Sequence, residues 1–186
     1  MRAAWYERNG PAAEVITIGE MPTPKPAPGE VLVRLATSGV NPSDWKTRSG
    51  RSRPIAWPRV IPHSDGAGTI EAVGEGVPRG RIGERVWIWN GQWKRAHGTA
   101  AECIALPAAQ AVRLPDGTGF DAGACLGIPA LTALHAVLTD GGVTGQRVLV
   151  TGGAGSVGHY AIQFARLLGA AQVIATVSGP EKAAHA

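Results

Sequence analysis

Val148-Leu-Val-Thr-Gly-Gly-Ala-Gly-Ser-Val-Gly158 is the part of the sequence that indicates the fold class most strongly. A short apolar run leads directly into a Gly-x-Gly-x-x-Gly pattern, in which the first glycine permits a tight turn and the second lets backbone N–H groups approach a pyrophosphate. The third glycine lets the following helix pack closely on the strand, so that its positive N-terminal end faces the anion. We therefore predict a dinucleotide-binding loop whose cofactor-contacting residues are Gly153, Gly155, Ser156, Val157 and Gly158.

The flanking sequence supports this interpretation. Residues 147–151 and 172–177 have the composition of buried strands, and residues 160–168 have the periodicity of an amphipathic helix that ends at Gly169. This strand–loop–helix–strand order predicts an α/β fold, specifically the first part of a Rossmann domain. The alternative is a glycine-rich turn that binds nothing.

The end of the second predicted strand bears on the choice of cofactor. Folds specific for NADH place Asp or Glu about 20 residues after the glycines, where it binds the ribose 2′-hydroxyl. This chain has Ser178 at that point and Lys182 shortly after it, while the nearest carboxylate, Glu181, falls in the next predicted helix. Because Ser178 can donate a hydrogen bond and Lys182 supplies positive charge to a 2′-phosphate, we predict NADPH. The alternative is that Ser178 caps the next helix and Lys182 is a solvated surface charge.

Composition limits the possible classes of protein. The chain has 186 residues, 44% of them hydrophobic, and a formal net charge of +4 without a run of basic residues. We predict a globular protein that does not bind nucleic acid. No apolar run reaches the roughly 18 residues needed to span a membrane, and the N-terminal sequence lacks the apolar core of a signal peptide, so a cytoplasmic setting is expected. The two cysteines, Cys103 and Cys125, are isolated and predict neither disulfide nor thiolate metal site.

The first 118 or so residues have a different character. Short strand-like runs separated by Gly and Pro predict a compact, barrel-like antiparallel domain; they are residues 14–18, 30–35, 68–73, 84–89, 100–106 and 111–114. From residue 119 the pattern changes to two helices, at 119–127 and 130–138, that lead into the nucleotide-binding part. We therefore predict two domains, residues 1–119 and residues 120–186.

Several ordered motifs together resemble one family. They include Ser38-Gly-Val-Asn-Pro-Ser-Asp44, Pro62-His-Ser-Asp-Gly-Ala-Gly68, Gly83-Glu-Arg-Val86, Gly127-Ile-Pro-Ala-Leu-Thr-Ala133 and the glycine loop. This set resembles the medium-chain dehydrogenase/reductase superfamily, in particular its zinc-independent NADPH:quinone reductase (zeta-crystallin-like) branch. The resemblance implies an N-terminal GroES-like β-barrel catalytic domain, a Rossmann domain and a cleft between them. Family chains are longer, so we expect this one to be a fragment, and a full-length chain to form a homodimer or homotetramer.

Zinc ligation offers an internal test of the branch. In the zinc-dependent alcohol dehydrogenases of the superfamily, the metal ligands occupy positions that match Asn41, Ser64 and Ile128 here. An isoleucine cannot ligate zinc, and amide or hydroxyl oxygens are poor substitutes for thiolate and imidazole. We therefore predict no metal, and a small-molecule acceptor that is already electron-poor, such as a quinone or an α,β-unsaturated carbonyl.

The resemblance also suggests candidate catalytic residues. Asn41 could donate a hydrogen bond to a developing oxyanion, or it could only hold the turn before a proline. Ser43 and Lys46 match positions that relay protons in the zinc enzymes, although many relatives have Tyr at the position of Lys46, which could equally be a solvated surface charge. Thr132 matches a threonine that faces the nicotinamide.

Tryptophans are concentrated in one part of the chain. Five of the six fall between residues 45 and 93, and aromatic walls can sandwich a flat substrate ring. We predict substrate contacts for Trp45, Trp57 and Trp89, with ordinary core packing as the alternative. We expect Asp65 to support the barrel and not to perform acid–base chemistry.

The leading hypothesis from the sequence is an NADPH-dependent quinone or enone reductase that works without a metal. A second enzymatic possibility is a 2-enoyl thioester reductase of the same superfamily. The non-enzymatic alternative is an NADPH-binding protein with a sensing role.

Overall fold

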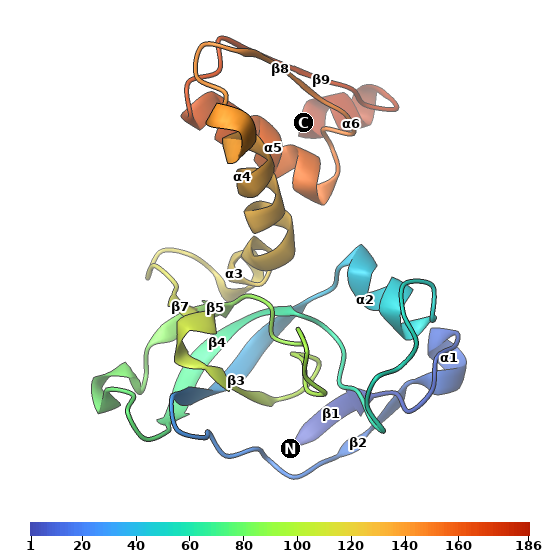
Figure 1. Ribbon diagram of the computed structural model, residues 1–186, viewed down its shortest axis with the longest axis vertical. Helices are drawn as coiled ribbons and strands as arrows, with labels where there is room; N and C mark the ends of the chain where they lie inside the picture. The colour runs from blue at the N-terminus through green and yellow to red at the C-terminus, as the bar shows by residue number, and fades with distance from the viewer. The chain divides into compact units, whose positions relative to one another are not determined.

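The computed structural model describes residues 1–186 and divides into two compact units, Met1–Ile128 and Pro129–Ala186 (Figure 1). This division falls nine residues after the boundary predicted from the sequence, which ends the first domain at residue 119. The reason lies in α3 (Phe120–Gly123), which packs on the sheet of the first unit. Thr37 Oγ1 donates a hydrogen bond of 2.7 Å to the carbonyl of Phe120, so this short helix is fastened to the strands and not to the nucleotide-binding part.

The larger sheet of the first unit is antiparallel, with five strands in the order β6-β3-β4-β5-β7. The strands are β3 (Glu30–Gly39), β4 (Asp65–Val73), β5 (Arg85–Ile88), β6 (Cys103–Pro107) and β7 (Ala111–Arg113). A second antiparallel pair consists of β1 (Arg2–Trp5) and β2 (Thr17–Glu20). The short helices of this unit are α1 (Ala12–Val15), α2 (Pro42–Arg48) and the 3₁₀ turns η1 (Arg79–Arg81) and η2 (Ala108–Gln110). These elements confirm the predicted antiparallel domain of short strands.

The core of the first unit is built from the alternating apolar residues of these strands. Because successive side chains on a strand point to opposite faces, β3 buries Val31 and Val33 completely on one face. The same cluster takes in one or two residues from each neighbouring strand: Ile70, Val86, Ile88, Ile104, Leu106 and Ala111. Each fully buried Val, Ile or Leu side chain contributes roughly 1.5–3 kcal/mol relative to an exposed one, so this cluster is the main source of stability of the sheet.

Several local predictions differ from the structure. Strand β1 was not predicted, and the helix predicted at 119–127 is limited to α3, with a π-helical turn at Leu126–Ala130 after it. Residues 14–18 were expected to form one strand, but the chain first makes one helical turn at α1, closed by the Ile16 N–H donating to the Ala12 carbonyl, and only then enters β2. The sequence pattern also did not predict α2. Its first residue is Pro42, and the Asn41 N–H donates a 2.7 Å hydrogen bond to the Asp44 carboxylate, an arrangement typical of a helix start.

The second unit contains one strand–helix–strand repeat. Strands β8 (Arg147–Val150) and β9 (Gln172–Ala175) pair in parallel, and α5 (Ser156–Leu167) connects them and packs on both. The predicted strands are confirmed, whereas the helix begins four residues earlier than predicted. The remaining elements are η3 (Leu126–Ala130, a π-helical turn at the division of the units), α4 (Leu131–Leu138), η4 (Thr139–Gly141) and α6 (Pro180–His185).

Candidate functional site

The glycine loop of the second unit joins β8 to α5 and is fastened to the end of β9. Gly152 has a φ of +70° and makes the sharp turn, a role that the sequence pattern had given to Gly153. The Gly152 N–H donates to Thr176 Oγ1 at 3.0 Å, and the Gly153 N–H donates to the Thr176 carbonyl at 2.9 Å. A Cβ on Gly158 would collide with the backbone carbonyl of Gly152, which accounts for glycine at the third position of the motif.

Helix α5 begins at Ser156, immediately after this loop. Gly155 is its N-cap residue and provides no side chain to bond the first-turn N–H groups. Those N–H groups, which include the ones of Ser156 and Val157, are therefore available to an anion at the positive end of the helix. The local geometry fits a pyrophosphate at the predicted residues.

A cavity of about 480 Å³ lies next to the loop. It is lined by Gly152, Ala154, Gly155, Thr176, Val177, Ser178 and Lys182. The structure thus brings Ser178 and Lys182 together with the glycine loop, as expected of residues that contact one dinucleotide.

The local structure around Ser178 argues against its alternative role as a helix cap. The N-cap position of α6 is held by Gly179, and no side chain caps this helix. Lys182 takes part in none of the four ion pairs of the chain, and Glu181 does not line the cavity. The free cation and the hydroxyl fit the 2′-phosphate of an NADP-type cofactor.

The first unit has a cavity of about 470 Å³ beside α2. Its walls are formed by Ser43, Asp44, Lys46, Thr47, Ser52, Arg53, Ser64, Asn90, Gln92, Trp93 and Ile128. Two predicted catalytic residues, Ser43 and Lys46, therefore face the same space as two residues at the positions of zinc ligands, Ser64 and Ile128.

Asn41 is only 6% exposed and is not among the residues that line this cavity, although Ser43 and Asp44, which follow it in the sequence, are. Its amide Nδ2 donates a 2.8 Å hydrogen bond to Oδ2 of Asp65, and the Ile128 N–H donates to the same oxygen at 2.8 Å. Asp65 is completely buried, and its Oδ1 has no hydrogen-bond partner. Burial raises the pKa of Asp65, while the hydrogen bonds from Ile128 and Asn41 lower it. Asp65 thus holds three separate segments together, which is the supporting role expected for it.

Asp44 lines the cavity and is the second carboxyl group near Asn41. Its Oδ2 accepts the hydrogen bond from the Asn41 backbone N–H. Burial raises the pKa of Asp44 to about 6; the hydrogen bond from Asn41 opposes this shift and the charge of Asp65 adds to it. The sequence analysis did not single out Asp44, although a carboxylate three residues after an Asn-Pro pair is a recognisable helix-start signal.

A series of hydrogen-bonded polar side chains, which the sequence did not predict, starts at Asp65. The Thr99 hydroxyl donates to the Asp65 carbonyl at 2.6 Å and lies 2.9 Å from the Ser38 hydroxyl, which in turn lies 2.9 Å from Nδ1 of His63. His63 has a φ of +76°, and burial lowers its pKa. These contacts join the ends of β3 and β4 at the side of the cavity.

The predicted substrate tryptophans lie in different surroundings. Trp57 lines a smaller cavity of about 250 Å³, together with Tyr6, Thr47, Arg53, Pro54, Ile55, Ala56, Val60, Gln92 and Lys94. Trp45 is partly exposed. The guanidinium carbon of Arg51 lies over its indole ring, 5.1 Å from the centre of that ring. Trp89 lines neither cavity, and its indole N–H donates to the Ala109 carbonyl at 3.2 Å, as a packing residue would.

Thr132 is an exposed residue near the start of α4 and belongs to the second unit. Its predicted contact with the nicotinamide stays a prediction.

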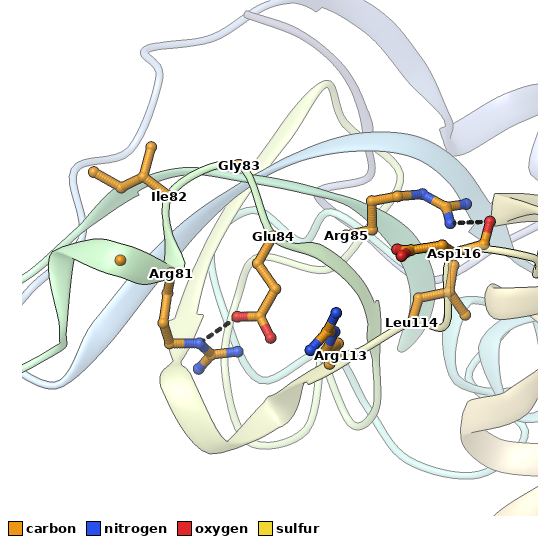
Figure 2. A pocket seen from close by; sticks show the side chains of 9 residues that line it. Arg81, Ile82, Gly83, Glu84, Arg85, Arg113, Leu114 and Asp116 are labelled. Atoms are coloured by element: carbon orange, nitrogen blue, oxygen red, sulfur yellow. Dashed lines mark hydrogen bonds and ion pairs between the residues drawn. The ribbon is translucent and has the colours of Figure 1, made fainter.

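A further cavity, about 720 Å³ beside η1, contains no predicted site residue (Figure 2). Two of its three arginines are used within the fold. Arg81 pairs with Glu84 and donates to the carbonyl groups of Ala108 and Ala111, and Arg85 donates to carbonyl groups of residues 115, 116 and 118. The third, Arg113, makes no ion pair and no side-chain hydrogen bond within the protein.

The chain contains no group of three or more His, Cys, Asp or Glu side chains placed to hold a metal ion. None of its helices has the length and apolar character needed to cross a membrane.

Comparison with known proteins agrees with this architecture. The family model of the alcohol dehydrogenase GroES-like domain matches residues 27–116. The chain is 34% identical over 179 residues to a chloroplast envelope quinone oxidoreductase homolog of Arabidopsis thaliana, covering 91% of this chain and 54% of the relative. It is 36% identical over 171 residues to a quinone oxidoreductase of Pseudomonas aeruginosa, covering 91% of this chain and 51% of the relative. The chain belongs to the medium-chain dehydrogenase/reductase superfamily.

Solved structures of this superfamily superpose on nearly the whole chain. A quinone oxidoreductase from Pseudomonas syringae has a TM-score of 0.86 at 34% identity, covering 99% of this chain and 55% of the other. A mycobacterial structure in complex with NADPH has a TM-score of 0.84 at 32% identity, covering 100% of this chain and 55% of the other. The chain thus spans about half the length of its medium-chain dehydrogenase/reductase relatives, and it has the GroES-like domain and first part of a Rossmann domain that the sequence predicted.

Proposed function

We propose that the protein is an NADPH-dependent reductase that delivers hydride to a quinone or an α,β-unsaturated carbonyl without a metal. The observation that carries this proposal is the composition of the α2 cavity, whose wall contains Ser64 and Ile128 where an imidazole and a thiolate would be needed to bind zinc. The quinone oxidoreductases among its relatives support the same class of reaction.

The cofactor supplies the hydride, so the chain's own residues have to bind it and orient the acceptor. In the second unit the free N–H groups at the start of α5 would hold the pyrophosphate, and Ser178 and Lys182 would hold the 2′-phosphate. The likeness to a mycobacterial structure in complex with NADPH supports this choice of cofactor.

Asn41 would stabilise negative charge that develops on the acceptor oxygen. One proton of its Nδ2 is donated to Asp65, which fixes the orientation of the amide. The second Nδ2 proton is then free to be donated to an oxyanion, and a donor that is already oriented needs no reorganisation during the reaction. Ser43 and Lys46 line the cavity beside it and would bind the substrate or pass a proton to it.

Cofactor binding provides the first test. NADPH and NADH are titrated into the wild-type protein, Lys182→Ala and the control Lys25→Ala, and the nicotinamide fluorescence is followed. A phosphate site at Lys182 predicts that only Lys182→Ala weakens NADPH binding, by about tenfold and toward the affinity for NADH, since a charge-assisted hydrogen bond is worth about 1.5–3 kcal/mol. Equal binding of both cofactors to the wild type would contradict the choice of NADPH.

Turnover provides the second test. Oxidation of NADPH is followed with quinones, enones, a 2-enoyl thioester and simple alcohols as partners. Reduction of quinones or enones is the expected result. Turnover of simple alcohols with NADP but of no quinone or enone would overturn the proposal. Preference for the thioester would favour the 2-enoyl thioester alternative, and NADPH binding with no turnover of any acceptor would favour the sensing role.

Two further proposals concern where the protein is found and how it assembles. We propose a cytoplasmic protein whose full-length chain forms a homodimer or homotetramer; light scattering that gives the mass of a monomer for the full-length protein would contradict the second statement.

A further inference from the structure

Two cavities of the first unit meet at Arg53. The 470 Å³ cavity beside α2 and the 250 Å³ cavity beside Tyr6 have Thr47, Arg53 and Gln92 in common as lining residues. We call the combined space the Arg53 cleft. Arg53 therefore borders both parts of this cleft.

The charges that line the Arg53 cleft are mostly positive. Lys46, Arg53 and Lys94 contribute cations, and Asp44 is the only carboxyl group in its walls. None of the three cations takes part in the four ion pairs of the chain, and none donates a side-chain hydrogen bond to a protein acceptor. An unneutralised set of cations around a cavity raises the local concentration of anionic ligands.

Aromatic rings hold these cations without neutralising them. Arg53 and Lys94 both lie over the ring of Trp93, at 5.9 Å and 5.7 Å from its centre, and Lys46 lies 6.0 Å from the ring centre of Trp45. Cation–π contacts of this kind position a cation but leave its N–H groups free to bind an anion. The cleft therefore presents positioned cations whose N–H groups are free to bind an anionic ligand.

Tyr6 adds a neutral donor to the cleft. The residue is only 2% exposed, its side chain lines the cavity, and its hydroxyl is not among the buried side-chain atoms that lack a partner, so it is accessible from the cavity. Burial raises the pKa of Tyr6 and the charge of Arg53 opposes that shift, so the hydroxyl keeps its proton at neutral pH and can donate it. A hydroxyl that is accessible from the cavity can donate its proton to an acceptor on a ligand.

Arginines that line a cavity differ in whether the fold already uses them. Beside η1, Arg81 binds a carboxylate and two backbone carbonyls, and Arg85 binds three backbone carbonyls (Figure 2). Arg53 has no such partners, and this difference distinguishes it from those two arginines.

We propose that the Arg53 cleft binds an acceptor that carries a carboxylate or an equivalent anionic group, with Arg53 and the Tyr6 hydroxyl as the groups that bind the anion. This inference rests on the proposed function for the identity of the reducible part, and it narrows the substrate class to anionic quinones or enones. The planar guanidinium fork suits the two oxygens of a carboxylate.

A pair of ligands that share the enone and differ in whether the carboxyl group is ionised or esterified tests this inference. Binding of 4-carboxybenzylideneacetone and of its methyl ester is measured by titration calorimetry, without cofactor, on the full protein. The wild type is expected to bind the acid about tenfold more tightly than the ester, as one charge-assisted hydrogen-bonded pair provides. Arg53→Gln is expected to remove that preference while leaving the affinity for the ester unchanged.

Two further variants keep the test decisive. Arg79→Gln removes the same charge from an exposed site outside the cleft and is expected to leave both affinities unchanged. Tyr6→Phe keeps the buried ring and removes only the hydroxyl, and it is expected to weaken the acid several-fold and not the ester. Equal binding of acid and ester by the wild type, or equal effects of Arg53→Gln and Arg79→Gln, would overturn the inference.

Activity separates this inference from the proposed function. If NADPH reduces the ester and the acid with equal efficiency and they bind equally, the reductase proposal stands and the anion preference fails. If the acid binds with the expected preference but no enone or quinone is reduced, the anion site stands and the reductase proposal fails.

Discussion

Asn41 and Asp65, 24 residues apart in the sequence, are joined by a buried hydrogen bond of 2.8 Å between an amide and a carboxylate. The bond connects the start of α2 to the start of β4, and the carboxylate oxygen also accepts the Ile128 N–H. The orientation of the Asn41 amide therefore depends on the same carboxylate that ties Ile128 to the start of β4.

Removing this amide should reduce stability. In Asn41→Ala, Asp65 keeps only the Ile128 N–H as a donor in a fully buried position. We expect the free energy of unfolding to fall by ~1–3 kcal/mol, the usual cost of leaving a buried polar group without a partner. Denaturant unfolding measures it. Gln163→Ala, which removes an exposed amide on α5, serves as the control and should change stability by less than about 0.5 kcal/mol. Equal losses in the two variants would show that the buried bond contributes nothing.

Asp44 should make the protein less stable as the pH rises. Its pKa of about 6 in the folded protein lies above that of an unfolded aspartate, near 3.9. Between about pH 4 and pH 6 the folded chain retains a proton that the unfolded chain has released, so the free energy of unfolding contributed by this group falls with increasing pH and stays lower above pH 6.

Asp44→Asn removes this titration and keeps an acceptor for the Asn41 N–H. We expect the variant to be more stable than wild type by ~2 kcal/mol above pH 7 and to lose the advantage toward pH 4. Urea unfolding at several pH values measures this difference. The exposed Asp116→Asn is the control and should have the same pH dependence as wild type. A constant difference between Asp44→Asn and wild type at every pH would contradict the expected titration.

A methyl group on Gly158 should disrupt the cofactor loop. The added Cβ would meet the Gly152 carbonyl, so α5 or the loop would have to move. We expect Gly158→Ala to lower the free energy of unfolding by ~1–3 kcal/mol, as overpacking does, and to weaken NADPH binding, measured by fluorescence titration. Gly117→Ala adds the same methyl group in open space and should affect neither property. Unchanged NADPH binding by Gly158→Ala would count against a pyrophosphate at this loop.

The sequence predicted the regular part of the second unit well. Strands β8 and β9 are continuous apolar runs, and the glycine pattern between them has a local physical requirement at each position. The allocation of the sharp turn, to Gly153 instead of Gly152, was wrong, because both glycines are adjacent and periodicity does not distinguish them. The predicted start of α5 was also four residues too late.

The composition of the substrate cavity was harder to predict. Tyr6 and Arg53 are 47 positions apart in the chain, and only the folded structure shows that they line one cavity. Trp89, expected to contact substrate, has its indole directed to a backbone carbonyl instead. Sequence position indicates which strand carries a side chain, but not which groups from distant segments stand opposite it.

The glycine loop and the proposed phosphate-selecting residues are attached to the nucleotide-binding unit in different ways. The loop is held by two hydrogen bonds to Thr176, whereas Ser178 and Lys182 follow β9 and take no part in those bonds. Substitutions at Ser178 and Lys182 therefore leave the fastening of the loop intact. On this scaffold the preference between the two nicotinamide dinucleotides can be re-engineered, or drift during evolution, as a trait separate from the ability to bind a dinucleotide at all.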